Sequence, residues 1–247
     1  MKVPKILIVP ALAVLFIMTV SVAPPPEVGK VTFPLGNVLI LSKGERQFRK
    51  VTFNMSVLNG DKIETKKQSR CELTFKDGSV VRIDEQSIYT VEKADMDNSN
   101  KNVESELSIG KLWANIKKVV SGRDSWKLKS PAAVVAVRGT IYRMNAGADS
   151  STQVLVYDGN VAVSPASPAA SQQGMGAVPG KPQQVQGPVQ IQGPRQVSMA
   201  EWFEIIKAQQ QIVVRPDGSY AKSEFNLADD DKLEWVQWNK ERDKMLE

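Results

Sequence analysis

Six glycines that each precede a short strand-like run constrain the fold of this chain more than any other feature. The residues after each glycine alternate in polarity or are β-branched, which is the pattern of a β-strand. Glycine accepts the positive φ angles of tight turns, so each unit predicts a turn followed by a strand. The spacing between successive units is irregular, which argues against a strict solenoid repeat but still predicts stacked hairpins. The glycines are Gly36, Gly60, Gly78, Gly110, Gly139 and Gly159.

These units predict an all-β domain over residues 30–163, built either as a two-layer sandwich or as a short irregular β-solenoid. Asp77-Gly78 and Asp158-Gly159 are strong tight-turn pairs and mark two hairpins. The single cysteine, Cys71, excludes an internal disulfide, and its alternation with Leu73 and Phe75 predicts a core position. The full predicted core comprises Val38, Ile40, Val57, Ile63, Leu73, Phe75, Val81, Ile83, Leu112, Ile116, Val135, Val137, Ile141, Val154, Val156 and Val161.

Residues 130–144 form a run of small and β-branched apolar side chains that suits a strand buried on both faces. Only Arg138-Gly139-Thr140 interrupts the run, and Gly139 suits a bend where two backbones approach closely. This stretch, which begins at Ser130-Pro131, resembles the signature strand of the FecR family, whose members are extracytoplasmic β-domains of bacterial envelope proteins.

Further elements resemble the same family in the same order along residues 30–163. They are Gly60-Asp61 with Ile63 and Thr65, the hairpin around Asp77-Gly78, the strand that begins at Gly110, and the closing pair around Asp158-Gly159. The residues that carry the resemblance are Gly60, Asp61, Asp77, Gly78, Gly110, Pro131, Arg138, Gly139, Thr140 and Gly159. The resemblance is specific for the fold and says less about function, because folds of this kind are reused as modules.

Residues 1–26 read as a signal peptide or a membrane anchor. Lys2 and Lys5 precede an uncharged apolar run over residues 6–23, which would span about 27 Å as a helix against a hydrocarbon core of about 30 Å. The lysines favour an exported body. Residues 21–23 have the small-x-small form of a cleavage site, but prolines follow at 24–26 and should make cleavage poor. We therefore favour an anchor in the cytoplasmic membrane over release into the periplasm or medium.

Regulators of the FecR family carry a cytoplasmic helical region before the membrane span, and that region acts on a sigma factor. Only residues 1–5 precede the apolar run here. The comparison with the family therefore implies a FecR-like domain without the cytoplasmic anti-sigma region.

The composition changes after the predicted β-domain. Residues 164–197 are rich in Pro, Gln and Gly and read as a linker. Residues 198–247 read as a helix–strand–helix tail: Ser198 and Glu201 form a capping box, and a second helix is expected from Asp229 to the end. Trp235 and Trp238 would share one face of that helix, and we expect the tail to pack on the β-domain.

Few residues offer catalytic or metal-binding chemistry. The chain has no histidine, which excludes Ser-His-Asp and Cys-His catalysis and leaves too few ligands for zinc. No cofactor motif is present. Asp95, Asp97 and Glu106 approach the spacing of an EF-hand calcium loop, but the turn glycine is replaced by Asn100. A polar surface loop is the simpler interpretation of that segment.

The sequence favours a non-enzymatic envelope protein that acts by binding, as an extracytoplasmic sensory or signal-relay module. A structural scaffold of a surface, cell-wall or secretion complex is the alternative, and a lysine- or carboxylate-based hydrolase is a third. Expected partners are the membrane through residues 6–23 and an envelope protein or cell-wall polymer. Nucleic acid is not expected, and no small-molecule substrate is identified. Basic residues that could attract anionic polymers are Lys66, Lys67, Arg70, Lys117, Lys118, Arg123, Lys127 and Lys129.

Overall fold

The computed structural model describes residues 26–97, 100–118, 124–166 and 204–246. Within these residues, two helices follow seventeen strands. The strands are β1 (Glu27–Leu35), β2 (Val38–Leu41), β3 (Arg49–Lys50), β4 (Ser56–Leu58), β5 (Lys62–Thr65), β6 (Arg70–Phe75), β7 (Val80–Ile83), β8 (Ser87–Asp97), β9 (Asn100–Asn115), β10 (Ser125–Lys129), β11 (Ala133–Val137), β12 (Ile141–Ala146), β13 (Thr152–Asp158), β14 (Asn160–Pro165), β15 (Glu204–Lys207), β16 (Gln210–Val214) and β17 (Tyr220–Glu224). The helices are α1 (Leu227–Asp230) and α2 (Glu234–Lys244).

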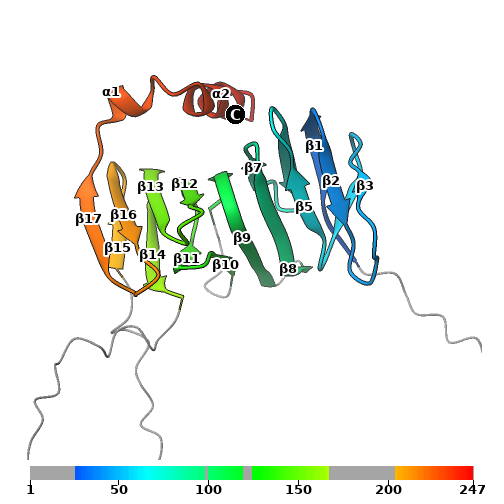
Figure 1. Ribbon diagram of the computed structural model, residues 1–247, viewed down its shortest axis with the longest axis horizontal. Helices are drawn as coiled ribbons and strands as arrows, with labels where there is room; N and C mark the ends of the chain where they lie inside the picture. Colours follow the sequence, from blue (N-terminus) through cyan, green and yellow to red (C-terminus); the bar gives the residue numbers. More distant parts are fainter. Residues whose placement is uncertain (1–25, 98–99, 119–123, 167–203, 247) are drawn as a thin grey trace, which may run out of the picture.

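The strands form two layers that share one long strand. Sheet A has the order β4-β1-β6-β7-β9-β12-β13-β16-β17. Sheet B has the order β3-β2-β5-β8-β9-β10-β11-β14-β15. The first half of β9 pairs in sheet B and its second half pairs in sheet A, so the layers are continuous through this strand. The predicted all-β architecture is confirmed as an open two-layer arrangement (Figure 1).

Five of the six glycine units mark places where the chain passes from one layer to the other. These crossings lie between β1 and β2, between β4 and β5, within β9, between β11 and β12, and between β13 and β14. Other crossings, such as those from β5 to β6 and from β7 to β8, lie at other residues. The glycines at these crossings are Gly36, Gly60, Gly110, Gly139 and Gly159, all with φ between 75° and 103°.

Gly78 differs, because it forms the β6–β7 turn within sheet A at φ 82°. Of the two hairpins predicted at Asp-Gly pairs, the one at Asp77-Gly78 is confirmed. The one at Asp158-Gly159 is wrong, because β13 pairs with β12 and β16 while β14 pairs with β11 and β15, so this turn is a corner between the layers.

The core lies between the two sheets and follows the alternation of the strands. Cys71, Leu73 and Phe75 of β6 point into it and are at most 2% exposed, as expected from the sequence. Burial raises the pKa of the Cys71 thiol. Every residue of the predicted core is buried there except Ile141, which is half-buried and packs on the opposite side of sheet A.

The C-terminal part differs from the expected helix–strand–helix order. Ser198 and Glu201 lie outside the described residues, but Glu204–Lys207 is a strand where the capping box predicted a helix. This strand pairs with β14, and Ile206 faces Val161 and is fully buried. Addition to a sheet edge therefore overrides the local helix signal. The expected final helix is split into α1 and α2, with a break before Leu233.

The apolar run over residues 6–23, residues 167–197 of the predicted linker (164–197) and Arg123 lie outside the described residues, while Ser164 and Pro165 belong to β14. Among the residues that the structure describes, no helix is both long and apolar enough to cross a membrane.

Candidate functional site

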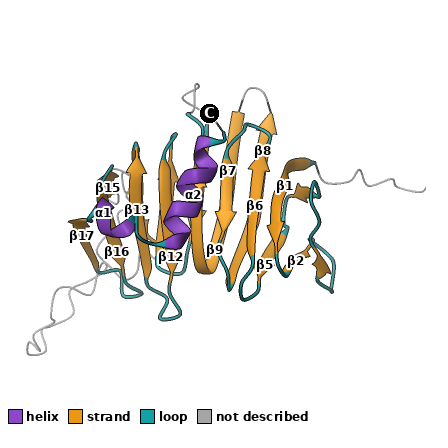
Figure 2. Cartoon of the chain, turned by 90° about the horizontal axis from the view of Figure 1, so that it is seen from above, coloured by secondary structure: helices purple, strands orange, loops and turns teal. Residues whose placement is uncertain are grey.

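The outer face of sheet A, which points away from the core, is partly covered by the C-terminal tail of residues 226–246. Helix α2 lies across the strands of this face (Figure 2). Trp235 and Val236 of α2 pack on Trp113 of β9 in a second apolar cluster. Trp235 and Trp238 stack with ring centroids 5.3 Å apart, so they share one helix face as predicted and dock on the body.

Buried charges hold the tail to this face. Arg82 of β7 is fully buried, and its Nε donates to Glu72 of β6 at 2.6 Å. The same guanidinium donates to Asp243 of α2 at 2.6 Å, while Arg242 donates to Glu72 at 2.8 and 2.9 Å. Asp243 also accepts the indole N–H of Trp113 at 2.9 Å. Two residues of the sheet and two of the helix thus form one ion network.

Glu72 makes this network sensitive to acid. Burial alone would raise the pKa of Glu72, but hydrogen bonds from Arg242, Arg82 and Thr32 outweigh burial and lower it to about 2. The folded pKa is below the unfolded value of about 4.5, so ionised Glu72 stabilises the fold above that pH, and the contribution is lost as pH falls toward 2. A shift of this size corresponds to about 3 kcal/mol.

We therefore expect the free energy of unfolding, measured by urea denaturation, to fall by up to about 3 kcal/mol between pH 5 and pH 2 through this one group. Glu72→Gln should lower stability at neutral pH and flatten the profile in this range. Glu45→Gln, which changes an exposed glutamate, is the matched control. An equally steep profile in Glu72→Gln would contradict the assignment.

Two more contacts fix the two ends of the short segment that joins α1 to α2. The guanidinium of Arg70 lies 5.1 and 5.0 Å from the ring centroids of Trp235 and Trp238 and forms a two-bond ion pair with Glu234. This pair lowers the pKa of Glu234. At the other end, Asp230 accepts from Arg143 and from the Tyr157 hydroxyl, both at 2.6 Å.

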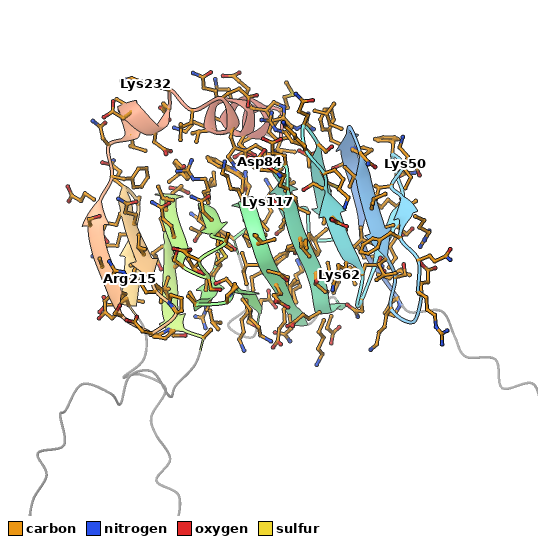
Figure 3. All side chains as sticks on the ribbon, viewed as in Figure 1. Lys50, Lys62, Asp84, Lys117, Arg215 and Lys232 are labelled. Carbon is orange, nitrogen blue, oxygen red and sulfur yellow. The ribbon has the colours of Figure 1, made fainter. Side chains whose placement is uncertain are left out.

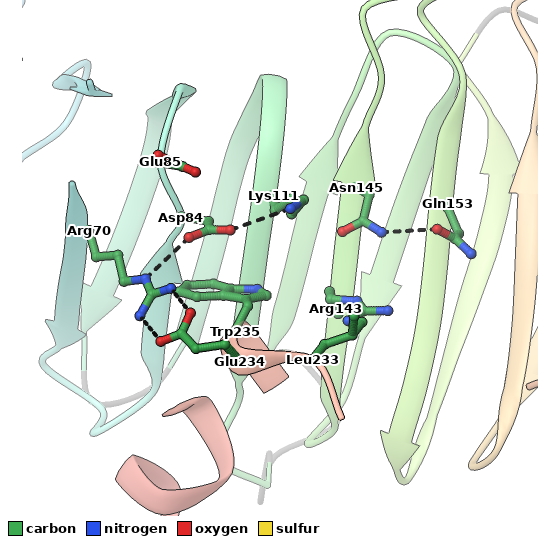
Figure 4. A pocket seen from close by; sticks show the side chains of 10 residues that line it. All are labelled: Arg70, Asp84, Glu85, Lys111, Arg143, Asn145, Gln153, Leu233, Glu234 and Trp235. Carbon is green, nitrogen blue, oxygen red and sulfur yellow. Dashed lines mark hydrogen bonds and ion pairs between the residues drawn. The ribbon is translucent and has the colours of Figure 1, made fainter. Parts of the chain in front are cut away.

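A groove of about 450 Å³ remains open between the start of α2 and sheet A (Figure 4). Acidic, basic and amide side chains from β6, β9, β12 and β13 and from the residues after β7 make up its floor, and Leu233, Glu234 and Trp235 form the wall on the tail side. Asp84, near the middle of the floor, lies on the side of the body next to the tail (Figure 3). The lining consists of Arg70, Asp84, Glu85, Lys111, Arg143, Asn145, Gln153, Leu233, Glu234 and Trp235.

The groove floor belongs to a row of polar side chains that crosses seven neighbouring strands of sheet A, about 29 Å at the usual strand spacing. Asp84 lies between Arg70 at 3.3 Å and Lys111 at 3.6 Å. Beyond Lys111, amides continue the row: Asn145 donates to Gln153 at 2.9 Å. Its last bonds run from Gln153 to Gln211 at 2.7 Å and from Gln211 to Ser223 at 3.2 Å. A second cavity of about 250 Å³ shares Arg70, Asp84 and Glu85 and extends the groove toward Leu35.

The groove contains carboxylates and a lysine, as a hydrolase would require, but Asp84, Glu234 and Lys111 are engaged in ion pairs, and Glu85 accepts from the Gln68 N–H at 2.6 Å. Asp84 contacts Arg70 and Lys111, and Glu234 contacts Arg70. A general acid needs a raised pKa, whereas the pKa of Glu234 is lowered. The arrangement is suited to recognition through charges and hydrogen bonds.

The calcium candidates are not brought together. Asp95 lies on β8 opposite Asn102, while Glu106 lies on β9 opposite Thr90. Asn102 and Glu106 are four residues apart on β9, so Asp95 and Glu106 lie about 14 Å apart along the strand direction. Asp97 ends β8, so the segment is a hairpin instead of a coordinating loop. Among the described residues, no three acidic or cysteine side chains are grouped closely enough to hold a metal ion.

The basic residues singled out in the sequence do not form a single patch. Lys127 and Lys129 lie on β10 of sheet B and contact Glu104, each at 3.7 Å, and Lys129 also contacts Glu92 at 2.8 Å. Lys66 pairs with Glu64. Arg70 belongs to the groove on sheet A.

The residues that carried the family resemblance shape corners and turns. Asp61 is fully buried and accepts from the Leu58 N–H at 2.8 Å, while Asp77 accepts from the N–H and the hydroxyl of Ser79, each at 2.9 Å. Thr140 donates to the Asn160 carbonyl at 2.7 Å and so joins two neighbouring crossings. Pro131 and Arg138 are exposed.

Residues 61–162, from the start of β5 into β14, match the family model described as FecR protein. This part of the chain is similar to the FecR domain. Strands β1 to β4 precede the matched range, yet they pair with strands inside it and complete both layers. The FecR domain indicates a regulatory role in signal transduction.

Two crystal structures, at 1.65 and 2.50 Å resolution, of a candidate anti-sigma factor from Parabacteroides distasonis are similar to the chain. Each has 17% sequence identity and a TM-score of 0.45, over 67% of this chain. The chain spans 60% of the length of those structures. No curated protein matches the sequence.

Sequence reasoning missed the charged residues that hold the tail. Alternation along β6 and β7 places Glu72 and Arg82 on the face opposite the core, so their outward direction could be inferred from the residue pattern. It gave no signal that Arg242 and Asp243 would cover them.

Proposed function

We propose that this protein is a non-enzymatic envelope protein whose FecR domain works outside the cytoplasm as a sensory or signal-relay module. The match of residues 61–162 to the FecR family carries the proposal. The apolar run over residues 6–23, preceded by Lys2 and Lys5, supports export with an anchored N-terminus. Recognition would take place on the outer face of sheet A, where polar side chains lie in an open groove.

The tail could transmit a binding event on this face to another part of the protein surface. Its contacts are buried ion pairs and cation–π stacks as well as apolar packing. Because the groove wall is made by the start of α2, occupation of the groove acts directly on Glu234 and Trp235. A ligand or partner protein that binds there would shift the position of α2, which a further partner could read.

Protease protection in the native cells tests the location. With an antibody against the body, we expect the full-length protein in the membrane fraction, and digestion of the body by protease added to cells whose outer layers have been opened. N-terminal sequencing should find Met1. A soluble product that begins at Pro24 would remove the anchor, and a body digested only after complete lysis would contradict the extracytoplasmic role.

A further inference from the structure

Three residues that line the groove on sheet A have buried polar atoms that the protein itself leaves unpaired. Arg143 and Trp235 are each 6% exposed, and neither the Nε of Arg143 nor the indole N–H of Trp235 has a partner among the described residues. The side-chain oxygen of Asn145 is also unpaired within that part of the chain. All three residues line this one cavity. Two donors and one acceptor thus lie unpaired, just beneath the surface, in residues around a single groove.

The charges of the groove are balanced. Three cationic side chains and three carboxylates line it, and Asp84 and Glu234 contact cations across the floor and wall. A polyanion such as a nucleic acid or an acidic polymer requires a positive surface, which this groove lacks. Leu233, which is 48% exposed, forms a single small apolar patch on the wall of the groove. A hydrophobic small molecule would therefore find little apolar surface to contact there.

We propose that this groove binds a neutral oligosaccharide. Each sugar hydroxyl donates and accepts, and planar amide, carboxylate and guanidinium groups supply paired acceptors and donors for neighbouring hydroxyls. The row from Arg70 to Ser223 contains all three kinds of group. Within the groove the row crosses the neighbouring strands β6, β7, β9, β12 and β13, so it fits an extended chain of sugars better than a single one.

An extended peptide fits less well. Peptides that bind sheets add a strand to a free edge, and the edges of sheet A are β4 and β17 at its two ends, whereas the groove lies across the strands between them. The other peptide modes need an apolar groove, aromatic slots or a cluster of unpaired arginines. Arg70 is paired with Asp84 and Glu234, and Arg143 with Asp230.

This inference rests on the proposed function and names a ligand class for the same face of sheet A. Its test requires only the purified, folded protein. Binding is measured on the purified full-length chain and location is measured in cells. Failure of one measurement therefore leaves the other interpretable.

The test is an array of neutral and charged oligosaccharides and mixed-sequence peptides, followed by calorimetry with β-1,4-linked glucose and N-acetylglucosamine oligomers from monosaccharide to hexasaccharide. We expect binding to neutral oligosaccharides that strengthens with chain length. Gln153→Ala and Asn145→Ala should each weaken it about tenfold, which corresponds to the loss of one or two hydrogen bonds. Gln47→Ala, an exposed amide in the β2–β3 loop, is the matched control and should leave it unchanged.

Three results would overturn the proposal. The first is no binding to any neutral oligosaccharide at millimolar concentration. The second is sugar binding of equal strength in Gln153→Ala, which would place the site elsewhere. The third is preferential binding of peptides or polyanions that Gln153→Ala weakens. Unfolding midpoints of the variants, measured in parallel, separate lost contacts from lost folding.

Discussion

Replacement of Arg82 by methionine should lower the free energy of unfolding by about 3–5 kcal/mol, the usual cost of removing one partner from a buried ion pair. The guanidinium is fully buried and holds Glu72 and Asp243, each at 2.6 Å. Without it, Glu72 keeps only Arg242 as a cationic partner among the described residues. The Asp243 carboxylate keeps only the indole N–H of Trp113 there, in a region with little water. Methionine keeps most of the volume, so the effect isolates the charge. Urea denaturation at neutral pH measures it.

Arg46→Met is the matched control, because Arg46 is exposed in the β2–β3 loop and its replacement should change stability by less than about 0.5 kcal/mol. Tryptophan fluorescence adds a local readout: Trp113 and Trp235 pack together only when α2 is docked. We expect the emission of Arg82→Met to move toward that of solvated indole before global unfolding. A stability loss below about 1 kcal/mol would mean that the tail is held mainly by its aromatic contacts.

The parts of the fold that depend on local chemistry could be predicted. A glycine that must take positive φ is visible in the sequence, and Gly139 and Gly159 do mark crossings between layers. Their placement has a tertiary reason as well: a Cβ on Gly159 would lie 2.9 Å from the carbonyl oxygen of Gly139. Strict alternation in β6 likewise identified its core face.

The parts of the fold that depend on which elements pack together could not be predicted from the sequence. The sequence of Glu204–Lys207 fits a helix start, and only the free edge of β14 makes it a strand. Period-two alternation shows that Glu72 faces away from the core but not that Arg242, 170 residues later, covers it. The candidate site was even harder to predict from local sequence, because the row from Arg70 to Ser223 forms only when seven strands pair side by side.

The largest local effect is expected at Gly110, where β9 passes from sheet B to sheet A. Gly110→Ala should lower the free energy of unfolding by at least about 4 kcal/mol, which would leave little of the stability of a typical domain. The residue has φ 103°, and a Cβ there would lie 2.0 Å from the Ser87 hydroxyl and 2.6 Å from the Ser87 Cα. Ser87 is fully buried and is fixed by bonds of 3.0 Å to the Glu85 carbonyl and from the Lys111 N–H.

Gly44→Ala separates backbone strain from crowding. Gly44 has a similar φ of 88°, but a Cβ there would meet no atom within 4 Å. Its replacement should cost only the 1–2 kcal/mol of a left-handed residue with a side chain. The difference between the two variants therefore measures how closely β9 and the start of β8 approach at the corner. Equal losses in Gly110→Ala and Gly44→Ala would show that the corner can open to admit a methyl group, and the continuous passage of β9 between the layers would then be a looser joint than its geometry indicates.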